Sequence, residues 1–301
     1  MPELPDVTVY VEALERRVVG ARLERVRIAS PFVLRSVEPP MTDAEGSTVT
    51  AVRRLGKRIV LALEPDLFFV IHLMIAGRLR WRRSGVAVPR GRGLAAFDLA
   101  EGTVLFTEEG RKHRAGLWLV RGEAALAAHD RGGIEPLGIS PAAFAHALTR
   151  ERHTLKRTLT DPSIFSGIGN AYSDEILHAA RLSPLQLGSN LNHDEMARLH
   201  AAVQDTLTTW TTRLRAEVGD GFPEKVTAFR PGMAVHGRFR EPCPDCGSPI
   251  QRIRYAENDV NYCATCQTGG RLLADRALSR LLREDWPRSL EEMESLQGRR
   301  E

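Results

Sequence analysis

The sequence lacks any hydrophobic run that approaches the roughly 20 apolar residues needed to cross a bilayer, which argues against a membrane-embedded protein. Its first residues, MPELPDVTVY, have neither the basic start nor the apolar stretch of a secretory signal peptide. We therefore expect a cytoplasmic protein without a membrane partner, in a prokaryote or an organelle-free compartment. Cysteine is also scarce, with four residues in 301, all between positions 243 and 266. One tight cluster in a cytosolic chain indicates a metal site rather than scattered disulfides.

Basic charge is the second compositional feature, because the formal net charge is +4 and the sequence pI is about 9.1. Apolar and charged residues make up 43% and 27% of the chain, which is typical of a globular protein, and the length allows two domains. The basic residues cluster beside glycine and proline in Trp81-Arg82-Arg83, Arg90-Gly91-Arg92, Arg111-Lys112-His113-Arg114 and Arg238-Phe239-Arg240. A solvated face explains any one cluster equally well, but four together favour a nucleic-acid partner.

Residues 1 to about 130 predict a β-rich domain, because short segments rich in Val, Ile, Leu and Phe are separated by Gly or Pro. Many short strands of this kind indicate a sandwich or a barrel. An amphipathic helix is expected at residues 7–19, with an apolar face of Val7, Val11, Leu14 and Val18. The expected strands are Arg22–Ala29, Thr48–Arg54, Arg58–Leu63, Phe68–Leu73 and Val104–Phe106, and residues 83–93 are expected to form a loop.

The composition changes around residues 130–141, where Gly and Pro accumulate, and we place a domain boundary there. Beyond this point the apolar periodicity is helical as far as about Arg215. The expected helices are Ala142–Thr149, Asn170–Arg181 and Asp194–Leu214, followed by a loop over residues 219–235. A last amphipathic helix is expected at Leu272–Arg283, where it either packs back on the protein or contacts a partner or DNA.

The four cysteines form two pairs, Cys243–Cys246 and Cys263–Cys266, with 16 residues between the pairs. A two-residue gap lets both sulfurs of a tight turn face one ion, and two such turns complete the tetrahedron of thiolates that Zn²⁺ prefers. The intervening residues Ser248–Tyr262 are long enough for a β-hairpin. Because four thiolates leave no position open for water, we expect one structural zinc ion. The alternatives are two disulfides or four separate thiols.

The chain begins with Met1-Pro2-Glu3, and Pro2 is small enough that removal of Met1 would expose a secondary amine. An α-amino group titrates near pH ~8, so an appreciable fraction is neutral at physiological pH. Such an amine can attack a sugar carbon by the logic of a Schiff-base lysine, and Glu3 can shuttle the proton. The plainer alternative is that Pro2 only starts a turn and Glu3 is solvated.

Together these features resemble one known family, the formamidopyrimidine-DNA glycosylase/endonuclease VIII (Fpg/Nei) family, over roughly residues 2–267. The shared motifs occur in the same order and are Pro2-Glu3, Leu55-Gly56-Lys57-Arg58, His72-Leu73, Gly167-Ile168-Gly169-Asn170 and the four-cysteine ribbon. The combination is much more specific than any one of its parts.

The resemblance implies an α+β multidomain fold. Its expected parts are an N-terminal β-sandwich with a long helix at 1–130, a helix-two-turn-helix domain at 131–236, a zinc β-hairpin at 237–270, and a helical C-terminal extension at 271–301. The implied partner is damaged DNA, bound between the two lobes with the damaged nucleotide flipped out of the duplex. We expect the protein to act on it as a monomer.

The activity that the resemblance implies is that of a bifunctional DNA glycosylase/AP lyase in base excision repair. Pro2 would displace the base and form an iminium, Glu3 would transfer protons, and Lys57 would assist near the sugar-phosphate. β- and δ-elimination would then nick the strand. The plainer alternative for Lys57 is that it is a surface residue of a strand with no role in the chemistry.

The resemblance also assigns Lys156, Asn170 and Arg238 to DNA binding. Residues 167–170 form a glycine-rich turn opening a helix, whose free N–H groups suit a phosphate oxygen. The plainer alternatives are that Asn170 is only an N-cap and that Lys156 is an exposed helical lysine. Arg238 leads into the zinc hairpin and is expected to meet phosphate, a contact that positions the enzyme without reading sequence.

Two departures from the family pattern concern single residues. Asp6 stands where the family usually has Glu, so this carboxylate is one methylene shorter. Asn258 stands where the hairpin normally presents an Arg, which weakens phosphate binding at the hairpin tip and leaves δ-elimination open. Arg252 and Arg254 also lie on the hairpin and are the candidates to replace that Arg in part.

A third departure concerns the side chains that fill the gap left by a flipped base. The family has a Met and an Arg/Phe pair where this chain has Ile75, His113 and Ala115. Ile75 can act as a wedge, and Arg111, Lys112 or Arg114 are the candidate substitutes on the later loop. Because a missing wedge makes extrusion from intact duplex harder, single-stranded or distorted DNA becomes a more attractive substrate.

Two other classes of function compete with the enzyme. One is a non-catalytic or weakly active lesion-binding protein, against which the presence of Pro2, Glu3 and Lys57 argues. The other is a zinc-ribbon transcription or RNA-associated factor, which explains the cysteines and the charge but leaves the N-terminus unexplained.

Overall fold

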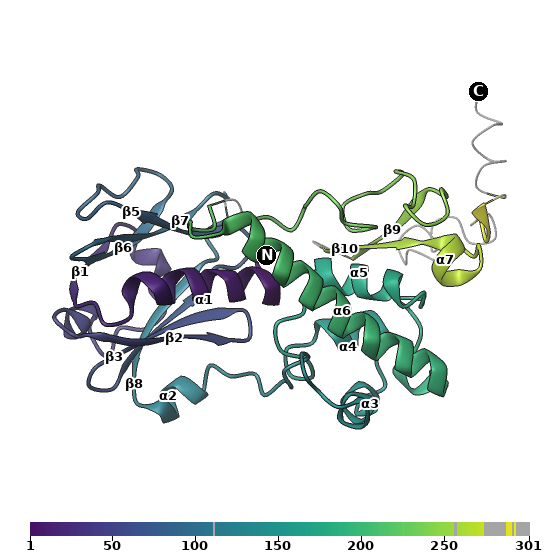
Figure 1. The fold of residues 1–301 in the computed structure, drawn as a ribbon, viewed down its shortest axis with the longest axis horizontal. Helices are drawn as coiled ribbons and strands as arrows, with labels where there is room; N and C mark the ends of the chain where they lie inside the picture. Colours follow the sequence, from purple (N-terminus) through teal and green to yellow (C-terminus); the bar gives the residue numbers. More distant parts are fainter. Residues whose placement is uncertain (111, 225, 256–257, 274–286, 291, 293–301) are drawn as a thin grey trace. The chain divides into compact units, whose positions relative to one another are not determined.

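The computed structural model describes residues 1–110, 112–224, 226–255, 258–273, 287–290 and 292 (Figure 1). The chain divides into two compact units. The N-terminal unit comprises residues 1–133 and 208–228, and the C-terminal unit comprises residues 134–207 and those from 229 onward. The helix expected at Leu272–Arg283 lies outside the described residues except for positions 272 and 273.

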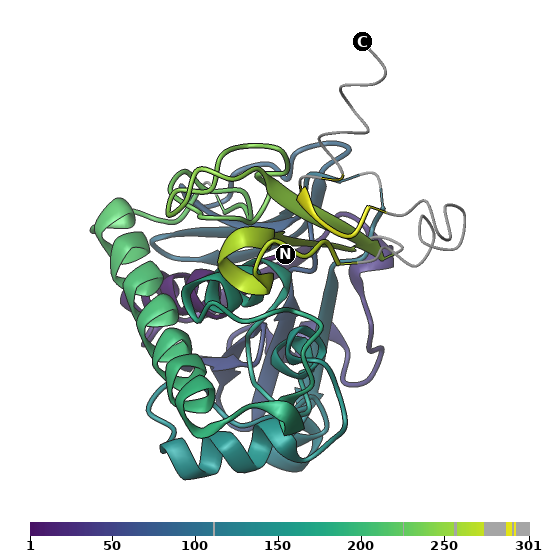
Figure 2. The ribbon, with the colours of Figure 1, turned by 90° about the vertical axis from the view of Figure 1, so that its right-hand side faces the viewer.

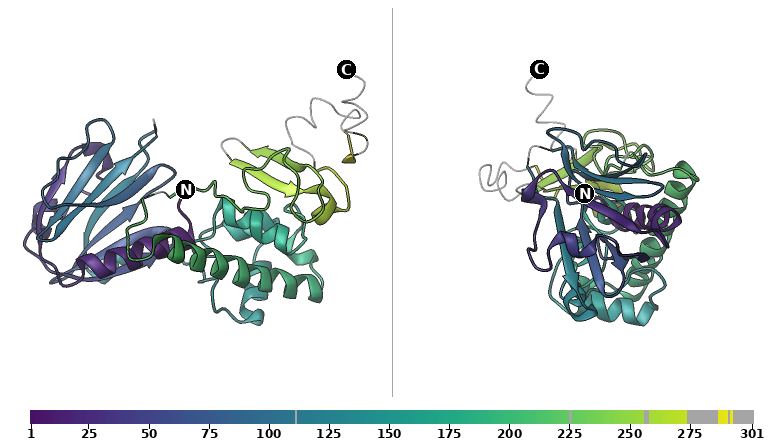
Figure 3. Two further views of the ribbon diagram at one scale, coloured as in Figure 1. Left: turned by 45° about the horizontal axis from the view of Figure 1, so that its top comes forward. Right: turned by 90° about the vertical axis from the view of Figure 1, so that its left-hand side faces the viewer.

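The N-terminal unit contains two four-stranded antiparallel sheets, of order β1-β6-β7-β5 and β2-β3-β4-β8 (Figure 3, left). Phe69 and Phe97, one from each sheet, meet edge to face with ring centroids 5.0 Å apart, so the sheets share one apolar core. The predicted β-sandwich is therefore confirmed. The strands are β1 (Leu23–Ile28), β2 (Val49–Leu55), β3 (Arg58–Leu63), β4 (Leu67–His72), β5 (Gly77–Arg82), β6 (Gly93–Leu99), β7 (Gly102–Glu108) and β8 (Gly116–Arg121).

After Arg58, strand β3 is apolar throughout because both of its faces are covered. Ile59 and Leu61 face the sandwich core, whereas Val60 packs in a second cluster with Leu126 of α2 (Glu123–Ala127). A strand buried on one face only would alternate apolar and polar residues. Two short 3₁₀ helices, η1 (Pro31–Val33) and η2 (Met41–Ala44), follow β1.

The helix α1 (Leu4–Val18) begins three residues before its predicted start. Glu3 and Asp6 form a capping box, and Pro5 lies in the first turn, where a missing N–H costs no helical hydrogen bond. The helix packs against β2 and β3 with an apolar stripe in the sandwich core. The capping box therefore fixes the conformation of the first residues of the chain, and the packing of α1 holds them on the N-terminal unit.

The C-terminal unit combines helices with a two-stranded antiparallel hairpin, which confirms the predicted helix-two-turn-helix and zinc-hairpin parts (Figure 2). Ser140 accepts a 3.3 Å hydrogen bond from Ala143 N and caps the first helix, which starts at Pro141. The elements are α3 (Pro141–Thr149), α4 (Leu155–Thr160), α5 (Asn170–Ala179), η3 (Gly188–Asn190), α6 (His193–Val218), β9 (Ile250–Tyr255), β10 (Asn258–Cys263) and α7 (Ala264–Thr268). The residues of α6 from Thr208 onward group with the N-terminal unit.

Among the residues described, no helix has the length and apolar character that crossing a membrane requires.

Candidate active site and metal centre

The predicted catalytic residues at the chain start are buried in the N-terminal unit. Pro2 is buried, and Glu3 and Asp6 are only 2% and 3% exposed. The backbone N–H of Glu3 donates to Asp6 Oδ2 at 2.9 Å. The shorter carboxylate at position 6 therefore still reaches its capping partner, and the alternative of a solvated Glu3 is wrong.

The amino group of this chain end lies in a charged and desolvated environment. Burial lowers the pKa of the Met1 amine below its ordinary value of 8.0. The carboxylates of Glu3 and Asp6 oppose this shift, whereas the cations of Arg78 and Lys57 lower the pKa further. The neutral, nucleophilic fraction of an amine at this position is therefore larger than that of a solvated chain end. Arg78 is a site residue that the sequence did not single out.

Lys57 lies in the two-residue turn between β2 and β3, where Leu55 pairs with Arg58. Gly56 in that turn has a φ of +61°, a conformation that tight hairpins require and that glycine adopts without strain. On the adjacent strand, burial and then the cations of Arg58 and Lys57 lower the pKa of His72 to about 4. Electrostatically, Lys57 therefore acts on both the chain-end amine and a neutral histidine.

In the C-terminal unit, Lys156 is only 7% exposed, so it is not a solvated helical lysine. Its Nζ donates to Asp174 Oδ1 at 2.5 Å and to the carbonyl of Asn170 at 2.6 Å. Asp174 Oδ2 also contacts His236 Nδ1 at 2.8 Å and accepts two hydrogen bonds from Asn261, one from the backbone and one from the amide. The carboxylate of Asp174 therefore joins α4, β10 and the segment before the hairpin.

Asn170 is the first residue of α5, and the N-cap is Gly169, so the capping role suggested for Asn170 is wrong. Its Nδ2 instead donates to the carbonyl of Asp259 at 2.8 Å, which links the start of α5 to β10. Gly167, with a φ of +83°, supplies the left-handed residue of the preceding turn. The turn and Lys156 thus lie together in one unit.

The guanidinium of Arg238 is engaged within the segment that leads into the hairpin. It donates to the carbonyls of Met233, Ala234 and Pro242, each at 3.2 Å, and pairs with Glu241 at 2.8 Å. These bonds hold the chain just before Cys243.

The hairpin arginines are partly neutralised by an acidic neighbour. Arg252 lies 3.4 Å and Arg254 3.7 Å from the carboxylate of Asp259. Asp259 therefore offsets part of their positive charge, which weakens the electrostatic attraction of the hairpin for a phosphate.

Of the residues expected near a flipped base, only some are exposed. Ile75 is 56% exposed on the turn after β4, next to Met74, which has a φ of +51°. Ala115 is 2% exposed and belongs to the sandwich core, so it cannot fill a gap in DNA. His113 Nδ1 lies 3.6 Å from the buried carboxylate of Glu108. Arg111 lies outside the described residues.

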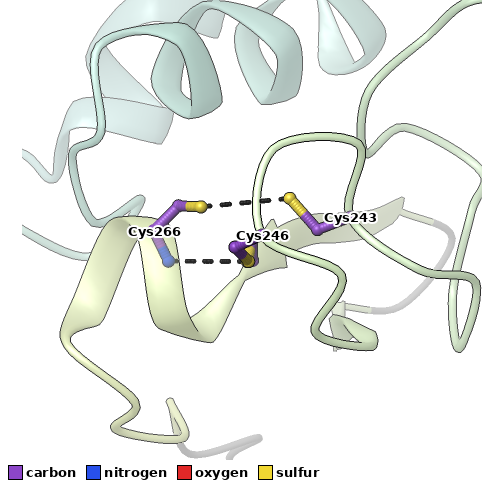
Figure 4. A group of neighbouring side chains, drawn as sticks. Cys243, Cys246 and Cys266 are labelled. Atoms are coloured by element: carbon purple, nitrogen blue, oxygen red, sulfur yellow. Dashed lines mark hydrogen bonds between the residues drawn. The ribbon is translucent and has the colours of Figure 1, made fainter.

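The four cysteines come together in the C-terminal unit, with all four sulfurs within 4.8 Å of one another. The Cys243 and Cys266 sulfurs are 3.9 Å apart and face each other (Figure 4), and those of Cys246 and Cys263 are 3.4 Å apart. Zn–S bonds of about 2.3 Å in a tetrahedron separate sulfurs by about 3.8 Å, whereas a disulfide bond is about 2.05 Å long. The donor set therefore fits one structural zinc ion, as predicted, and the disulfide alternative is wrong.

Three family models match the chain in the order of its parts. The formamidopyrimidine-DNA glycosylase N-terminal domain matches residues 1–115, and the H2TH domain of the same enzyme matches residues 133–213. The zinc finger found in FPG and IleRS matches residues 240–269.

Relatives and solved structures agree with these matches. A formamidopyrimidine-DNA glycosylase of Heliobacterium modesticaldum is 34% identical over 279 residues, which is 89% of this chain and 100% of the relative. A formamidopyrimidine-DNA glycosylase-like protein of Mycobacterium tuberculosis is 39% identical over 151 residues, 50% of this chain and 94% of the relative. The Lactococcus lactis Fpg in complex with abasic-site DNA has the same fold, with a TM-score of 0.76 at 22% identity over 88% of this chain and 99% of that chain. The chain therefore belongs to the formamidopyrimidine-DNA glycosylase (Fpg/Nei) family of DNA-repair glycosylases.

Proposed function

We propose that this protein is a bifunctional DNA glycosylase and AP lyase that excises damaged bases with Pro2 as the nucleophile. The observation that carries the proposal is the environment of the chain-end amine, whose pKa burial lowers, beside the buried carboxylate of Glu3 and within the field of Lys57. Once Met1 is removed, the chain-end amine is the secondary amine of Pro2, one residue further along the chain than the amine of Met1. Damaged DNA, the ligand in the structures of Lactococcus lactis Fpg, is the proposed substrate.

The proposed chemistry uses only groups of the N-terminal unit, namely the chain-end nitrogen of Pro2 and the side chains of Glu3 and Lys57. The lone pair of the Pro2 nitrogen attacks C1′ of the damaged nucleotide, and the C1′–N glycosidic bond breaks with its electron pair leaving on the base. The departing base takes up the proton that the attacking nitrogen loses. The freed lone pair of the nitrogen then breaks the C1′–O4′ bond while Glu3 donates a proton to O4′, which opens the sugar ring and gives an iminium. Removal of a C2′ proton then breaks the C3′–O bond by β-elimination, and δ-elimination releases the other phosphate. Lys57 stabilises the negative charge of the sugar-phosphate.

The proposed DNA-binding residues are Lys156, Asn170 and Arg238 of the C-terminal unit. The N–H groups of the turn before α5 and the amide of Asn170 suit a phosphate oxygen. Because the cations of Lys156 and Arg238 already bond within the protein, we propose that they mainly hold the turn and the hairpin in place while adding positive charge.

Borohydride trapping on an oligonucleotide with one abasic site tests the proposal. The processed wild type should form a covalent adduct, and Pro2→Gly and Glu3→Gln should lose most of it. Mass spectrometry of the N-terminus must show that Met1 is absent from the trapped protein. A matched control is Pro5→Ala, which changes a buried proline in the first turn of α1 whose nitrogen is an amide and cannot form an iminium.

An adduct of equal yield in Pro2→Gly, or an adduct mapped to another residue, would contradict Pro2 as the nucleophile. Binding of abasic DNA without any adduct in the processed wild type would favour the second candidate, a lesion-binding protein without turnover. That candidate rests on the wedge: Ile75 is exposed, but Ala115 is buried in the core where the family has a side chain that separates base pairs. The same observation supports single-stranded or distorted DNA as the preferred substrate.

A further inference from the structure

One buried histidine beside the metal centre belongs to neither the four-cysteine set nor the proposed chemistry. His178 lies in the last turn of α5 and is 3% exposed. Its Nε2 is 3.3 Å from the sulfur of Cys243, which is itself 3% exposed, and 4.0 Å from the carboxylate of Asp245. This is hydrogen-bond distance for an N–H donor and a sulfur acceptor.

Two roles for this imidazole are compatible with its position. It can donate its N–H to the Cys243 thiolate, or it can bind the metal itself, because His178, Asp245 and Cys266 also offer atoms within 4.8 Å of one another. The four sulfurs already supply the four ligands that a structural zinc ion takes, and four thiolates around Zn²⁺ carry a net charge of −2. An N–H donor then stabilises the site more than a fifth ligand, because it withdraws charge from one sulfur.

The position of His178 along α5 gives this contact a second consequence. Asn170, Asp174 and His178 are spaced four residues apart and so lie on one face of the helix. All three contact the zinc-bearing part of the unit: Asn170 bonds Asp259, Asp174 bonds Asn261, and His178 reaches Cys243. This polar face of α5, residues 170, 174 and 178, therefore ends directly on a metal ligand.

We propose that His178 is a positioning residue of the zinc centre, whose Nε2–H donates a hydrogen bond to the Cys243 thiolate and thereby raises the affinity for the metal. The proposal concerns the metal and stands independently of the glycosylase chemistry.

The test uses the full-length protein and three variants. His178→Phe keeps the ring and removes the donor, whereas His178→Gln places an amide nitrogen close to the position of Nε2. The matched control is His200→Phe in the same unit, which removes a 2.9 Å contact between a helical histidine and the carbonyl of Ile139, away from the cysteines.

Zinc affinity is measured by competition with a chromophoric chelator. We expect His178→Phe to bind zinc about 10–100-fold more weakly than the wild type. His178→Gln should recover most of the loss, and His200→Phe should match the wild type. Unchanged affinity in His178→Phe, or equal losses in His178→Phe and His200→Phe, would overturn the proposal.

Cobalt substitution separates the two roles of the imidazole. The visible spectrum of the Co²⁺ protein should show four sulfur donors in both the wild type and His178→Phe, with a shift in the sulfur-to-metal charge-transfer band. Bands of a three-sulfur, one-nitrogen site in the wild type would make His178 a ligand and refute the donor role.

If His178→Phe fails to fold, ¹⁵N chemical shifts of the histidine rings in the zinc-loaded wild type decide instead. A proton on Nε2 of His178 supports the proposal, and a proton on Nδ1 alone overturns it.

Discussion

Replacing Lys156 with Met separates the internal role of this lysine from direct contact with DNA. Lys156 is 7% exposed, and its ammonium lies between Asp174 at 2.5 Å and the carbonyl of Asn170 at 2.6 Å. Breaking a buried ion pair by removing one partner costs about 3–5 kcal/mol, because the other charge is left uncompensated. Asp174 keeps its contacts with His236 and Asn261. We therefore expect the free energy of unfolding to fall by about 2–3 kcal/mol.

Two measurements are needed, both on zinc-loaded protein. Urea unfolding gives the stability loss, and affinity for abasic-site DNA at several salt concentrations gives the electrostatic contribution. A lysine that neutralises a phosphate adds about 1 to the slope of log K against log salt. Because the ammonium of Lys156 is committed inside the protein, Lys156→Met should leave the slope nearly unchanged while lowering the affinity. The exposed Lys112, changed to Met, is the control for stability, with an expected effect within about 0.5 kcal/mol.

The opposite pattern would refute this reasoning. If Lys156→Met loses less than about 1 kcal/mol of stability and the salt slope falls by about 1, the ammonium leaves Asp174 to bind phosphate.

Three further outcomes are expected. The pKa of His72 is about 4 in the folded protein, below its ordinary 6.5, so the unfolded state takes up the proton first as the pH falls. The free energy of unfolding should therefore drop by about 2 kcal/mol between pH 7 and pH 5. His72→Gln should remove this loss, which urea titrations at the two pH values will show. Equal acid losses in both proteins would contradict it. Chelation of zinc should abolish DNA binding before the N-terminal sandwich unfolds, which circular dichroism and fluorescence anisotropy can follow, and retained affinity in metal-free protein would rule out the hairpin's role. Ile75→Ala should reduce excision from paired duplex more than from single-stranded DNA, measured as single-turnover rates, and equal reductions would show that Ile75 is no wedge.

Five of the eight strands of the sandwich, β1 to β4 and β7, could be predicted from the sequence, but β5, β6 and β8 were missed. In β5, Arg78, Arg80 and Arg82 alternate with Leu79 and Trp81, and its last two residues were assigned to a basic cluster. In the structure β5 is an edge strand paired with β7, and its arginines share the face opposite Leu79, which is buried in the core. The pairing partner that makes such a segment a strand is distant in sequence, so local composition does not reveal it.

The residues of the site also divide into those that local sequence patterns reveal and those that they do not. The four zinc ligands are a local pattern whose spacing carries the chemistry, and they were identified without a structure. The start of the chain is also a local pattern, and its catalytic role stays a prediction from the sequence. The network around Asp174 was not, because charged residues on a helix are usually exposed. Its partners His236 and Asn261 lie 62 and 87 residues away along the chain. Only the fold brings them together.

The buried polar residues of α5 give a physical reason to expect that metal binding and DNA binding are coupled in this protein. A buried carboxylate is tolerated only when hydrogen-bonded or paired. Asp174 depends on Lys156, His236 and Asn261, while Glu175 accepts N–H groups from residues 234, 235 and 236. Most of these partners belong to the segment that zinc organises. If the hairpin unfolds, these carboxylates lose most of their partners, and α5 must move or take up water. The turn at residues 167–170 opens that helix, so we expect its geometry to depend on the metal even though none of its residues is a predicted ligand.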